Sequence, residues 1–245
     1  MRRFDDSLRL DEQLARGLLT DADMNELGQV IATRHASADI VPAGKRDRQI
    51  TTTIRFIEDN FRFLHGHVEP MRLQRLIDWS MSAVERSRAL LGQRFDAGCV
   101  RDCHGDLHLG NLVRLPDGIA TFDCIEFDPE LREIDTVCDL AFLVMDLVAR
   151  DRHDLAAHFL NRYLECSGDY EGIALLDLFF VYRCLVRAKV AAIGLDAGLS
   201  PPELDRTRAE LERYINMAER QAHKRPPMLG VMHGVSGTGK TWLST

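Results

Sequence analysis

The chain has 245 residues, of which 45% are hydrophobic and 28% charged, and its formal net charge at pH 7 is −7. This length allows a sizeable core in one large or two small domains. The acidic balance, with Arg residues interspersed among Asp and Glu, excludes the massed basic surface that binds nucleic acid, so we expect no nucleic-acid partner. No apolar run reaches the roughly 18 residues of a membrane-spanning helix, and the N-terminus lacks the apolar core of a signal peptide. We therefore expect no membrane partner and a cytoplasmic location. The sequence does not fix the oligomeric state.

Six cysteines are scattered along the chain without a C-x-x-C pair. Their spacing argues against a disulfide scaffold and against a zinc ribbon.

The first ninety residues carry helical patterns. Ser7–Gly17 is typical of a short helix closed by glycine, and Thr20 followed by Asp23 forms a capping box at the start of the next one. Apolar residues at helical spacing then predict a helix over about residues 50–64 and another that begins after Pro70 and ends near Gly92. We interpret all of these helices as scaffold.

The stretch from Cys103 to Asp123 carries the clearest chemistry and the only clear strand signals. It places a carboxylate at Asp106, a carboxamide five residues later at Asn111 and a second carboxylate twelve residues further at Asp123. The segments around Pro116-Asp117-Gly118 predict a hairpin, which folds Asp123 back beside Asn111. A loop Asp that can act as a base, beside two facing oxygen ligands, is what a phosphotransfer site for a magnesium–nucleotide complex needs.

Other polar residues nearby leave alternatives open. His104 is expected to anchor the loop by hydrogen bonds, whereas His108, a second candidate catalytic residue, could contact phosphate or simply pack. A rival interpretation takes His104, Asp106 and His108 as an H-x-D-x-H metal cluster of a hydrolase. It is weaker because no further ligand group supports it and Asn111 would be left unused.

The segment after the hairpin begins with a polar loop over residues 124–132 and continues as an apolar, buried helix from about Ile134 to Val148. Asp135 and Asp139 lie four residues apart and are expected on one face of this helix. We interpret both as structural residues that brace the loop or pair with an Arg.

Two further helices are expected at about residues 155–165 and 174–195, the second with Arg183, Arg187 and Lys189 emerging from it. Pro201-Pro202 then opens a strongly charged helix, Glu203–His223, which we interpret as solvated or as a bridge between domains. Residues 224–227 (Lys-Arg-Pro-Pro) are expected to be a linker.

The last stretch, residues 228–245, predicts the start of a P-loop domain. An apolar, strand-like run is followed by a segment that matches G-x-x-x-x-G-K-[ST]. In such a loop backbone N–H groups cradle phosphates, the lysine reaches the β- and γ-phosphates, and the threonine binds magnesium. The candidate cofactor-binding residues are Gly234, Gly237, Gly239, Lys240 and Thr241. Four residues after the motif the chain stops, so we expect only the front edge of this domain.

The motif H-G-D-L-H-L-G-N at residues 104–111, followed by Phe122-Asp123, resembles the catalytic loop and metal-binding segment of the aminoglycoside phosphotransferase-like branch of the protein-kinase-like superfamily. The resemblance covers about residues 1–220. It implies an α+β, predominantly α-helical fold equivalent to a kinase C-terminal lobe, in which residues 1–223 form one domain. It also implies that Asp106 deprotonates the acceptor hydroxyl, while Asn111 and Asp123 hold Mg²⁺ against the phosphates of ATP.

The chain also departs from that family. Its small β-rich lobe, with a Gly-rich loop, a strand lysine and a helix glutamate, has no counterpart, and Lys45 in a loop is a poor substitute for the lysine. The leading hypothesis is therefore an N-terminally truncated, ATP-dependent phosphotransferase that acts on a small hydroxylated acceptor with impaired activity. A second hypothesis is a non-catalytic module that positions a downstream P-loop ATPase or kinase domain. A third takes the P-loop as the working site.

Overall fold

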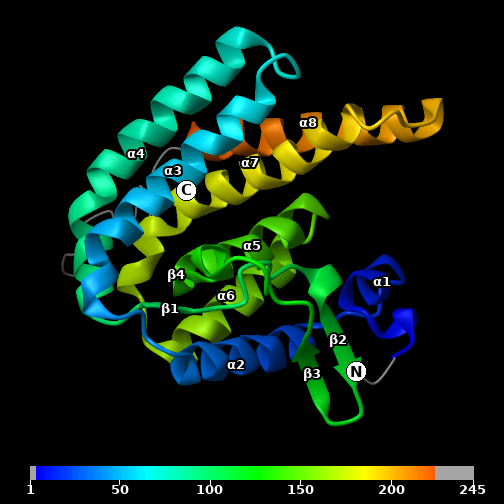
Figure 1. Cartoon of the computed structure of the whole chain (residues 1–245). Helices are drawn as coiled ribbons and strands as arrows, with labels where there is room; N and C mark the ends of the chain where they lie inside the picture. The colour runs from blue at the N-terminus through cyan, green and yellow to red at the C-terminus, as the bar shows by residue number, and fades with distance from the viewer. Residues whose placement is uncertain (1–3, 224–245) are drawn as a thin grey trace, which may run out of the picture.

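The computed structural model describes residues 4–223, so the expected linker and the P-loop segment lie outside the described residues. The helices and strands are shown in Figure 1. The helices are α1 (Leu10–Ala15), α2 (Asp21–Ser37), α3 (Arg46–Leu64), α4 (Pro70–Asp96), α5 (Thr136–Ala149), α6 (His153–Ser167), α7 (Leu176–Leu195) and α8 (Pro201–Ala222). The strands are β1 (Val100–Asp102), β2 (Leu112–Leu115), β3 (Gly118–Thr121) and β4 (Glu133–Asp135). The described part of the chain is thus predominantly α-helical with small antiparallel sheets, as the sequence predicts.

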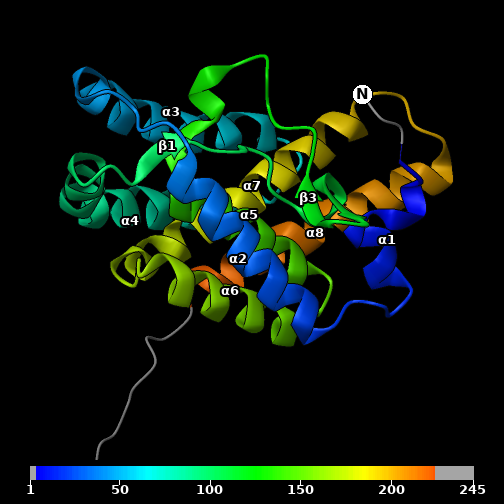
Figure 2. The same ribbon diagram turned by 90° about the horizontal axis from the view of Figure 1, so that it is seen from below.

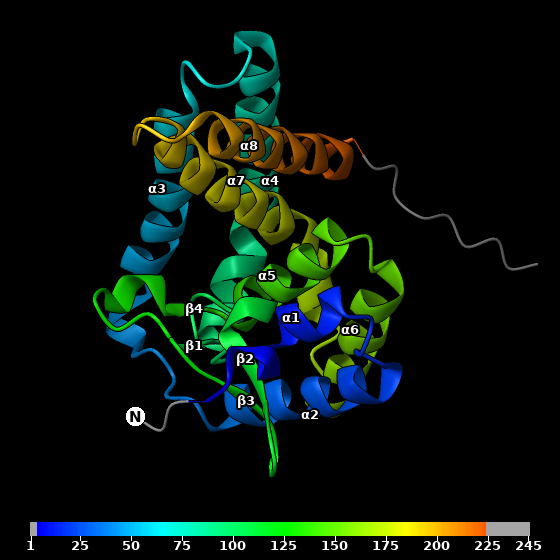
Figure 3. The same ribbon diagram turned by 90° about the vertical axis from the view of Figure 1, so that its right-hand side faces the viewer.

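Helix α5 lies at the centre of the fold, and every residue of it except Val148 is buried. Helices α6 and α7 pack on α5, and α2 runs along α6 (Figure 2). On the other side, α3, α4 and α8 gather around α7 (Figure 3). This burial confirms the expectation drawn from the apolar sequence of α5. No helix within residues 4–223 is long and apolar enough to cross a membrane.

Of the four N-terminal helices, α2 and α4 begin where the sequence predicts, whereas α1 begins at Leu10 instead of Ser7 and α3 begins at Arg46, ahead of the expected residue 50. The capping box at α2 is formed, with the backbone N–H of Thr20 donating to the Asp23 carboxylate at 2.8 Å. Helix α4 starts at Pro70 and continues to Asp96, past the expected end at Gly92. Its last turn is retained because Phe95 is buried against Val41 and Val100.

The predicted start of α5 at Ile134 is wrong, because Glu133–Asp135 forms strand β4 instead. This strand pairs antiparallel with β1, Val100 opposite Asp135. The side chain of Asp135 then accepts a hydrogen bond from the N–H of Val137 and caps the helix. Asp135 therefore precedes the helix, and it does not share a helical face with Asp139.

The expectation of a solvated or bridging helix near the C-terminus is also corrected. One face of α8 is buried against α7, and the buried residues are Leu211, Tyr214, Ile215, Met217 and Ala218. Charged residues occupy the remaining surface, where Glu212 and Glu219 pair with Arg72 of α4. The many charged residues of α8 obscure the narrow apolar stripe in its sequence, but this stripe is sufficient to pack the helix against α7.

The expected hairpin is formed by β2 and β3, with Leu112 opposite Thr121 and Leu115 opposite Gly118. Pro116 and Asp117 make the turn. Helix α2 lies beside β3, where the Glu26 carboxylate accepts a hydrogen bond from the N–H of Ile119 at 2.7 Å. The hairpin is thereby fixed to the helical body.

Candidate active site

The candidate site is built on the loop that leaves β1 at Cys103. Gly105 sits in this loop with φ +83°, a left-handed conformation that glycine adopts without strain. A Cβ atom at this position would lie 2.8 Å from the carbonyl oxygen of Leu131. The loop therefore packs tightly against the segment that leads into β4.

Two buried carboxylates of α5 hold the backbone of this loop. Asp139 accepts hydrogen bonds from the N–H of His104 at 3.1 Å and from the N–H of Gly105 at 3.0 Å. Seven residues further along α5, the Asp146 carboxylate accepts a hydrogen bond from the N–H of Leu109 at 3.0 Å. The expectation that Asp139 braces the loop is confirmed.

Asp135 pairs with an arginine, which is the other structural role that the sequence allowed. Its carboxylate pairs with the guanidinium of Arg94 through two hydrogen bonds of 2.8 and 2.9 Å, and both side chains are almost fully buried. Arg94 also binds Asp169, so one guanidinium joins α4, the start of α5 and the turn after α6.

The carboxylate of Asp106 is held by its own loop. The side-chain N–H groups of Asn111 donate to the Asp106 carbonyl and carboxylate oxygens, each at 2.9 Å. Nε2 of His108 lies 3.4 Å from the same carboxylate, which remains 38% exposed. Burial opposes ionisation, but the hydrogen bond from His108, with the charge of Arg183, holds the pKa of Asp106 below its usual value. Asp106 is thus oriented, ionised at neutral pH and reachable.

The two histidines of the motif hold the loop together. Nδ1 of His104 accepts from the N–H of Asp106 at 3.3 Å, and its Nε2 lies 2.8 Å from the carbonyl oxygen of Phe122, to which it donates. His104 is thus a loop anchor, as expected. Nδ1 of His108 accepts from the N–H of Gly110 at 3.1 Å, which leaves its Nε2–H to face Asp106.

The H-x-D-x-H metal interpretation does not fit this geometry, because both ring nitrogens of His104 are engaged with backbone groups. Among residues 4–223, the group of three side chains with potential ligand atoms within 4.8 Å of one another is His35, Cys103 and Asp139.

Asn111 and Asp123 line one open cavity of about 350 Å³. The hairpin brings them together, since the N–H of Phe122 donates to the carbonyl oxygen of Asn111 at 3.0 Å. Asp123 is exposed and has φ 57°, a left-handed conformation that Asp tolerates better than most residues. Its carboxylate receives no hydrogen bond from residues 4–223, and neither does the side-chain oxygen of Asn111. Two oxygen atoms that are available as metal ligands and line the same cavity suit a hard cation such as Mg²⁺.

Several residues of this cavity could not be identified from sequence. Its walls include Arg9 and Asp11 at the N-terminus, Arg150 after α5 and Arg187 of α7. Each arginine has an acidic partner: Asp11 for Arg9, Asp146 for Arg150 and Glu210 for Arg187. These residues are far apart in sequence and share no motif, so no local signal marks them. The scaffold interpretation of the N-terminal segment was therefore too narrow.

Arg183 was expected to emerge from α7, but its side chain is buried. Its Nε donates to the carbonyl oxygen of Cys138 at 3.1 Å, and its guanidinium lies 4.7 Å from the centre of the Phe142 ring. His108 packs on the same ring, with 5.5 Å between ring centres. Arg183 therefore supplies a buried positive charge beneath the loop.

The candidate cofactor-binding residues of the P-loop motif lie outside the described residues. They are Gly234, Gly237, Gly239, Lys240 and Thr241.

The comparisons with known proteins give similarity but no activity. No protein-family model matches the chain. Two proteins of Mycobacterium tuberculosis and one of Mycobacterium bovis, each named as uncharacterized, are 30% identical over 251 residues, which cover 100% of this chain and 49% of theirs. The chain thus spans about half the length of these curated relatives. Among solved structures, an ethanolamine kinase of Plasmodium vivax is 12% identical with a TM-score of 0.48, covering 80% of this chain and 59% of that one.

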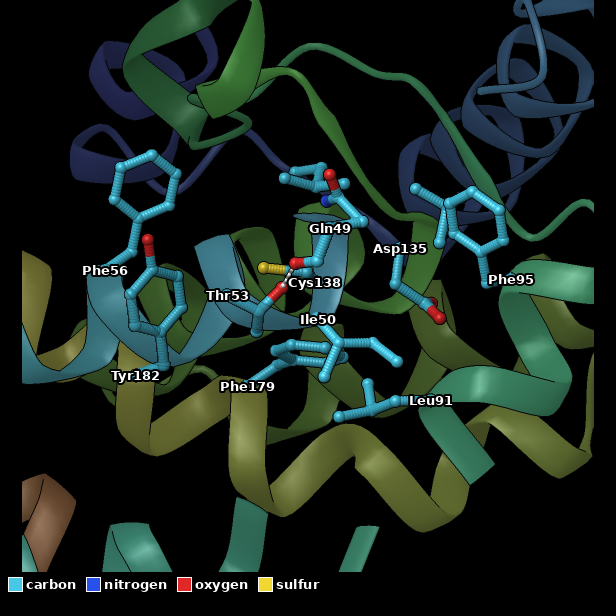
Figure 4. A pocket seen from close by; sticks show the side chains of 12 residues that line it. Gln49, Ile50, Thr53, Phe56, Leu91, Phe95, Asp135, Cys138, Phe179 and Tyr182 are labelled. Carbon is cyan, nitrogen blue, oxygen red and sulfur yellow. Dashed lines mark hydrogen bonds between the residues drawn. The ribbon is translucent and has the colours of Figure 1, made fainter. Parts of the chain in front are cut away.

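A second cavity lies between α3, α4, α5 and α7 (Figure 4). Aromatic side chains, including Phe56, Phe179 and Tyr182, form much of its wall, with Thr53 and Cys138 beside them. Its volume of about 30 Å³ exceeds the roughly 10–15 Å³ that one water molecule requires, so it has room for only a few waters. This cavity is too small for an acceptor substrate, and the open cavity at Asn111 and Asp123 remains the candidate site.

Proposed function

We propose that this chain forms the catalytic-loop part of an ATP-dependent phosphotransferase that acts on a small hydroxylated acceptor. One observation carries the proposal: Asn111 donates to the carboxylate of Asp106 while lining, together with Asp123, a cavity with free oxygen donors. The side chain of Asn111 thus contacts the candidate base and is also part of the candidate metal site. This arrangement agrees with the motif resemblance, which implies the same three residues.

In this proposal Asp106 is the base. Its depressed pKa keeps the carboxylate ionised near neutral pH, so it can accept a hydrogen bond from the acceptor hydroxyl and take its proton during transfer. His108 acts as a positioning residue, because its Nε2–H faces the same carboxylate. The geometry therefore favours orientation of the acceptor oxygen over activation by a strong base, as is usual for phosphoryl transfer.

The residues that would hold magnesium are Asn111, through its side-chain oxygen, and Asp123. When bound there, Mg²⁺ neutralises charge on the nucleotide phosphates. Since both amide hydrogens of Asn111 already donate to Asp106, its orientation is fixed with the oxygen turned away from Asp106. Metal binding and the orientation of the base are thereby coupled through one carboxamide.

Phosphoryl transfer from labelled ATP tests the role of Asp106. The chain and an Asp106→Asn variant are incubated with magnesium and a panel of aminoglycosides, sugars and amino alcohols. Loss of a positioned base is expected to slow transfer about 10²-fold or more. Asp102→Asn is the matched control, because it makes the same chemical change four residues earlier and is expected to retain activity. Equal turnover by the chain and Asp106→Asn would remove Asp106 from the mechanism.

Calorimetry with Mg–ATP separates this site from the P-loop motif. Asp123→Asn is expected to weaken binding, whereas Lys240→Ala is expected to leave the component at Asn111 and Asp123 intact. Loss of all binding in Lys240→Ala alone would instead favour the P-loop as the working site. Absence of binding in the unmodified chain would favour a non-catalytic module.

A further inference from the structure

A buried histidine of α2 reaches the carboxylate that braces the catalytic loop. Nε2 of His35 lies 3.2 Å from Oδ2 of Asp139, and its Nδ1 lies 2.8 Å from the hydroxyl oxygen of Tyr163 on α6. His35 is 3% exposed and Tyr163 is 2% exposed. The three residues come from three helices. His35 lies 104 residues before Asp139 and 128 residues before Tyr163 in the sequence.

The hydrogen-bond pattern fixes the direction of each contact. The carboxylate of Asp139 already accepts from the backbone N–H groups of His104 and Gly105, so it is an acceptor toward His35 as well. Nε2 of His35 must therefore carry the proton and donate. Nδ1 is then free to accept from the hydroxyl group of Tyr163.

A metal centre is the rival explanation for this cluster, since Sγ of Cys103 also lies within the 4.8 Å group. Both oxygens of Asp139 are occupied by backbone donors, and Sγ of Cys103 donates to the carbonyl oxygen of Ile134 at 3.5 Å. Burial raises the pKa of the Cys103 thiol well above its usual value, which opposes the thiolate that a metal needs. The contacts thus describe a hydrogen-bonded brace.

We propose that His35, held by Tyr163, is a positioning residue that fixes the rotation of the Asp139 carboxylate and thereby the conformation of residues 103–106. A carboxylate that receives two backbone donors must present one oxygen to each, and the donor from His35 to Oδ2 reinforces that rotation. The importance of this loop for catalysis rests on the proposed function, but its conformation does not.

The consequence of losing His35 follows from the burial of Asp139. Burial favours the neutral acid, and the hydrogen bond from His35, followed by the charge of Arg183, holds the pKa of Asp139 below its usual value. Without His35 the buried carboxylate keeps only the two backbone donors, and its rotation is held less firmly. The loop then opens more often, because its own backbone bonds to Asp139 are weakened.

Amide hydrogen exchange of residues 103–107 in the full chain tests the proposal. His35→Leu removes the donor, and His35→Gln offers an amide N–H near the position of Nε2. Exchange at His104 and Gly105 is expected to rise about tenfold in His35→Leu, the effect of one lost hydrogen bond to a charged group. The glutamine variant is expected to restore most of the protection. Met217→Ala on α8 is the control, because it disturbs the core far from the loop.

The ratio of exchange in the loop to exchange in the core of α7 distinguishes the outcomes. A ratio that rises in His35→Leu, stays low in His35→Gln and does not rise in Met217→Ala supports the proposal. A uniform rise along the chain, no rise at all or no rescue by glutamine overturns it. In proton NMR spectra, a slowly exchanging imidazole N–H of His35 that shifts in Tyr163→Phe is also expected, and its absence contradicts the assigned donor. None of these readouts requires activity, so failure of the proposed phosphotransfer would be seen separately.

Discussion

The two halves of the candidate site are held in different ways. Asp106 and its loop are fixed from inside the protein by Asn111, His108 and the buried carboxylates of α5. Asp123, by contrast, is exposed, and its carboxylate receives no hydrogen bond from residues 4–223. Its backbone is nevertheless anchored, because the preceding Phe122 is bonded to both Asn111 and His104.

The difference matches what each half has to do. A base must be aimed at a hydroxyl and kept ionised before the substrate arrives, which requires protein contacts. A metal ligand needs only its backbone fixed, since the cation itself orients the carboxylate. We therefore expect substitutions in the first half to cost stability, and substitutions in the second half to cost binding alone.

Removal of the Asp139 carboxylate is expected to have the largest effect on stability. Asp139→Ala leaves His35 and two backbone N–H groups without their acceptor in a buried site. We expect the free energy of unfolding to fall by about 3–5 kcal/mol. Denaturant midpoints measure this fall. Asp78→Ala on the exposed side of α4 is the control and is expected to stay within about 0.5 kcal/mol of the unmodified chain. A small change in Asp139→Ala would show that the loop is not braced.

Alanine at Gly105 is expected to have the next largest effect. Gly105 and Gly168 both have left-handed backbones, with φ +83° and +71°, so strain at φ is common to the two substitutions. Only at Gly105 does an added Cβ meet a neighbour, the carbonyl oxygen of Leu131 at 2.8 Å. Gly105→Ala should therefore lose about 1–3 kcal/mol more stability than Gly168→Ala, the usual cost of overpacking. Equal losses would contradict the close packing of the loop.

The pH dependence of stability tests how Asp106 is held. Its pKa is lower in the folded chain than the ordinary value of 3.8, because the hydrogen bond from His108 and the charge of Arg183 outweigh burial. A depressed folded pKa contributes stability that is present above about pH 3.8 and is lost as the pH falls through the lower folded value. Urea midpoints measured from pH 6 down to pH 3 should therefore fall less steeply for Asp106→Asn than for the unmodified chain. If the urea midpoints of the two proteins fell in parallel with pH, the neighbours of Asp106 would not stabilise its ionised carboxylate in the folded chain.

The smallest effect on stability is expected at Asp123. Asn tolerates the left-handed backbone at this position, and the carboxylate has no hydrogen bond to lose within residues 4–223. Asp123→Asn should change the free energy of unfolding by less than about 0.5 kcal/mol. The affinity for Mg–ATP, measured by calorimetry in the same preparation, should fall. A large loss of stability in Asp123→Asn would contradict the expectation that this half of the site contributes to binding and not to stability.

Local patterns in the sequence predicted much of this structure, because the interactions behind them are local. The capping box at Thr20, the hairpin after Asn111 and the buried helix α5 all follow from residue types at short spacing. The structural roles of Asp135 and Asp139 were also expected, although their shared helical face was not correct. Strands β1 and β4 were missed because three residues are too few to show an alternating pattern.

The remaining errors concern contacts between distant segments. The burial of Arg183 depends on the ring of Phe142, and the bracing by His35 depends on a carboxylate 104 residues away. The cavity wall at Arg9 is formed only when the segment around Arg9 lies beside Arg150 and Arg187, which are more than 140 positions away. No periodicity or motif reports such pairs, since they are set by packing of the whole fold.

Paramagnetic broadening by Mn²⁺–ATP tests most directly whether Asn111, which holds Asp106, and Asp123 form one metal–nucleotide site. Mn²⁺ replaces Mg²⁺ at oxygen ligands and broadens the NMR signals of nearby amides. In the Lys240→Ala variant, which removes the lysine of the P-loop motif, we predict that broadening is strongest at residues 108–111 and 122–124. It should disappear from both segments together in the Asp123→Asn form of that variant. Broadening confined to other parts of the chain, or none at all, would contradict the proposed site.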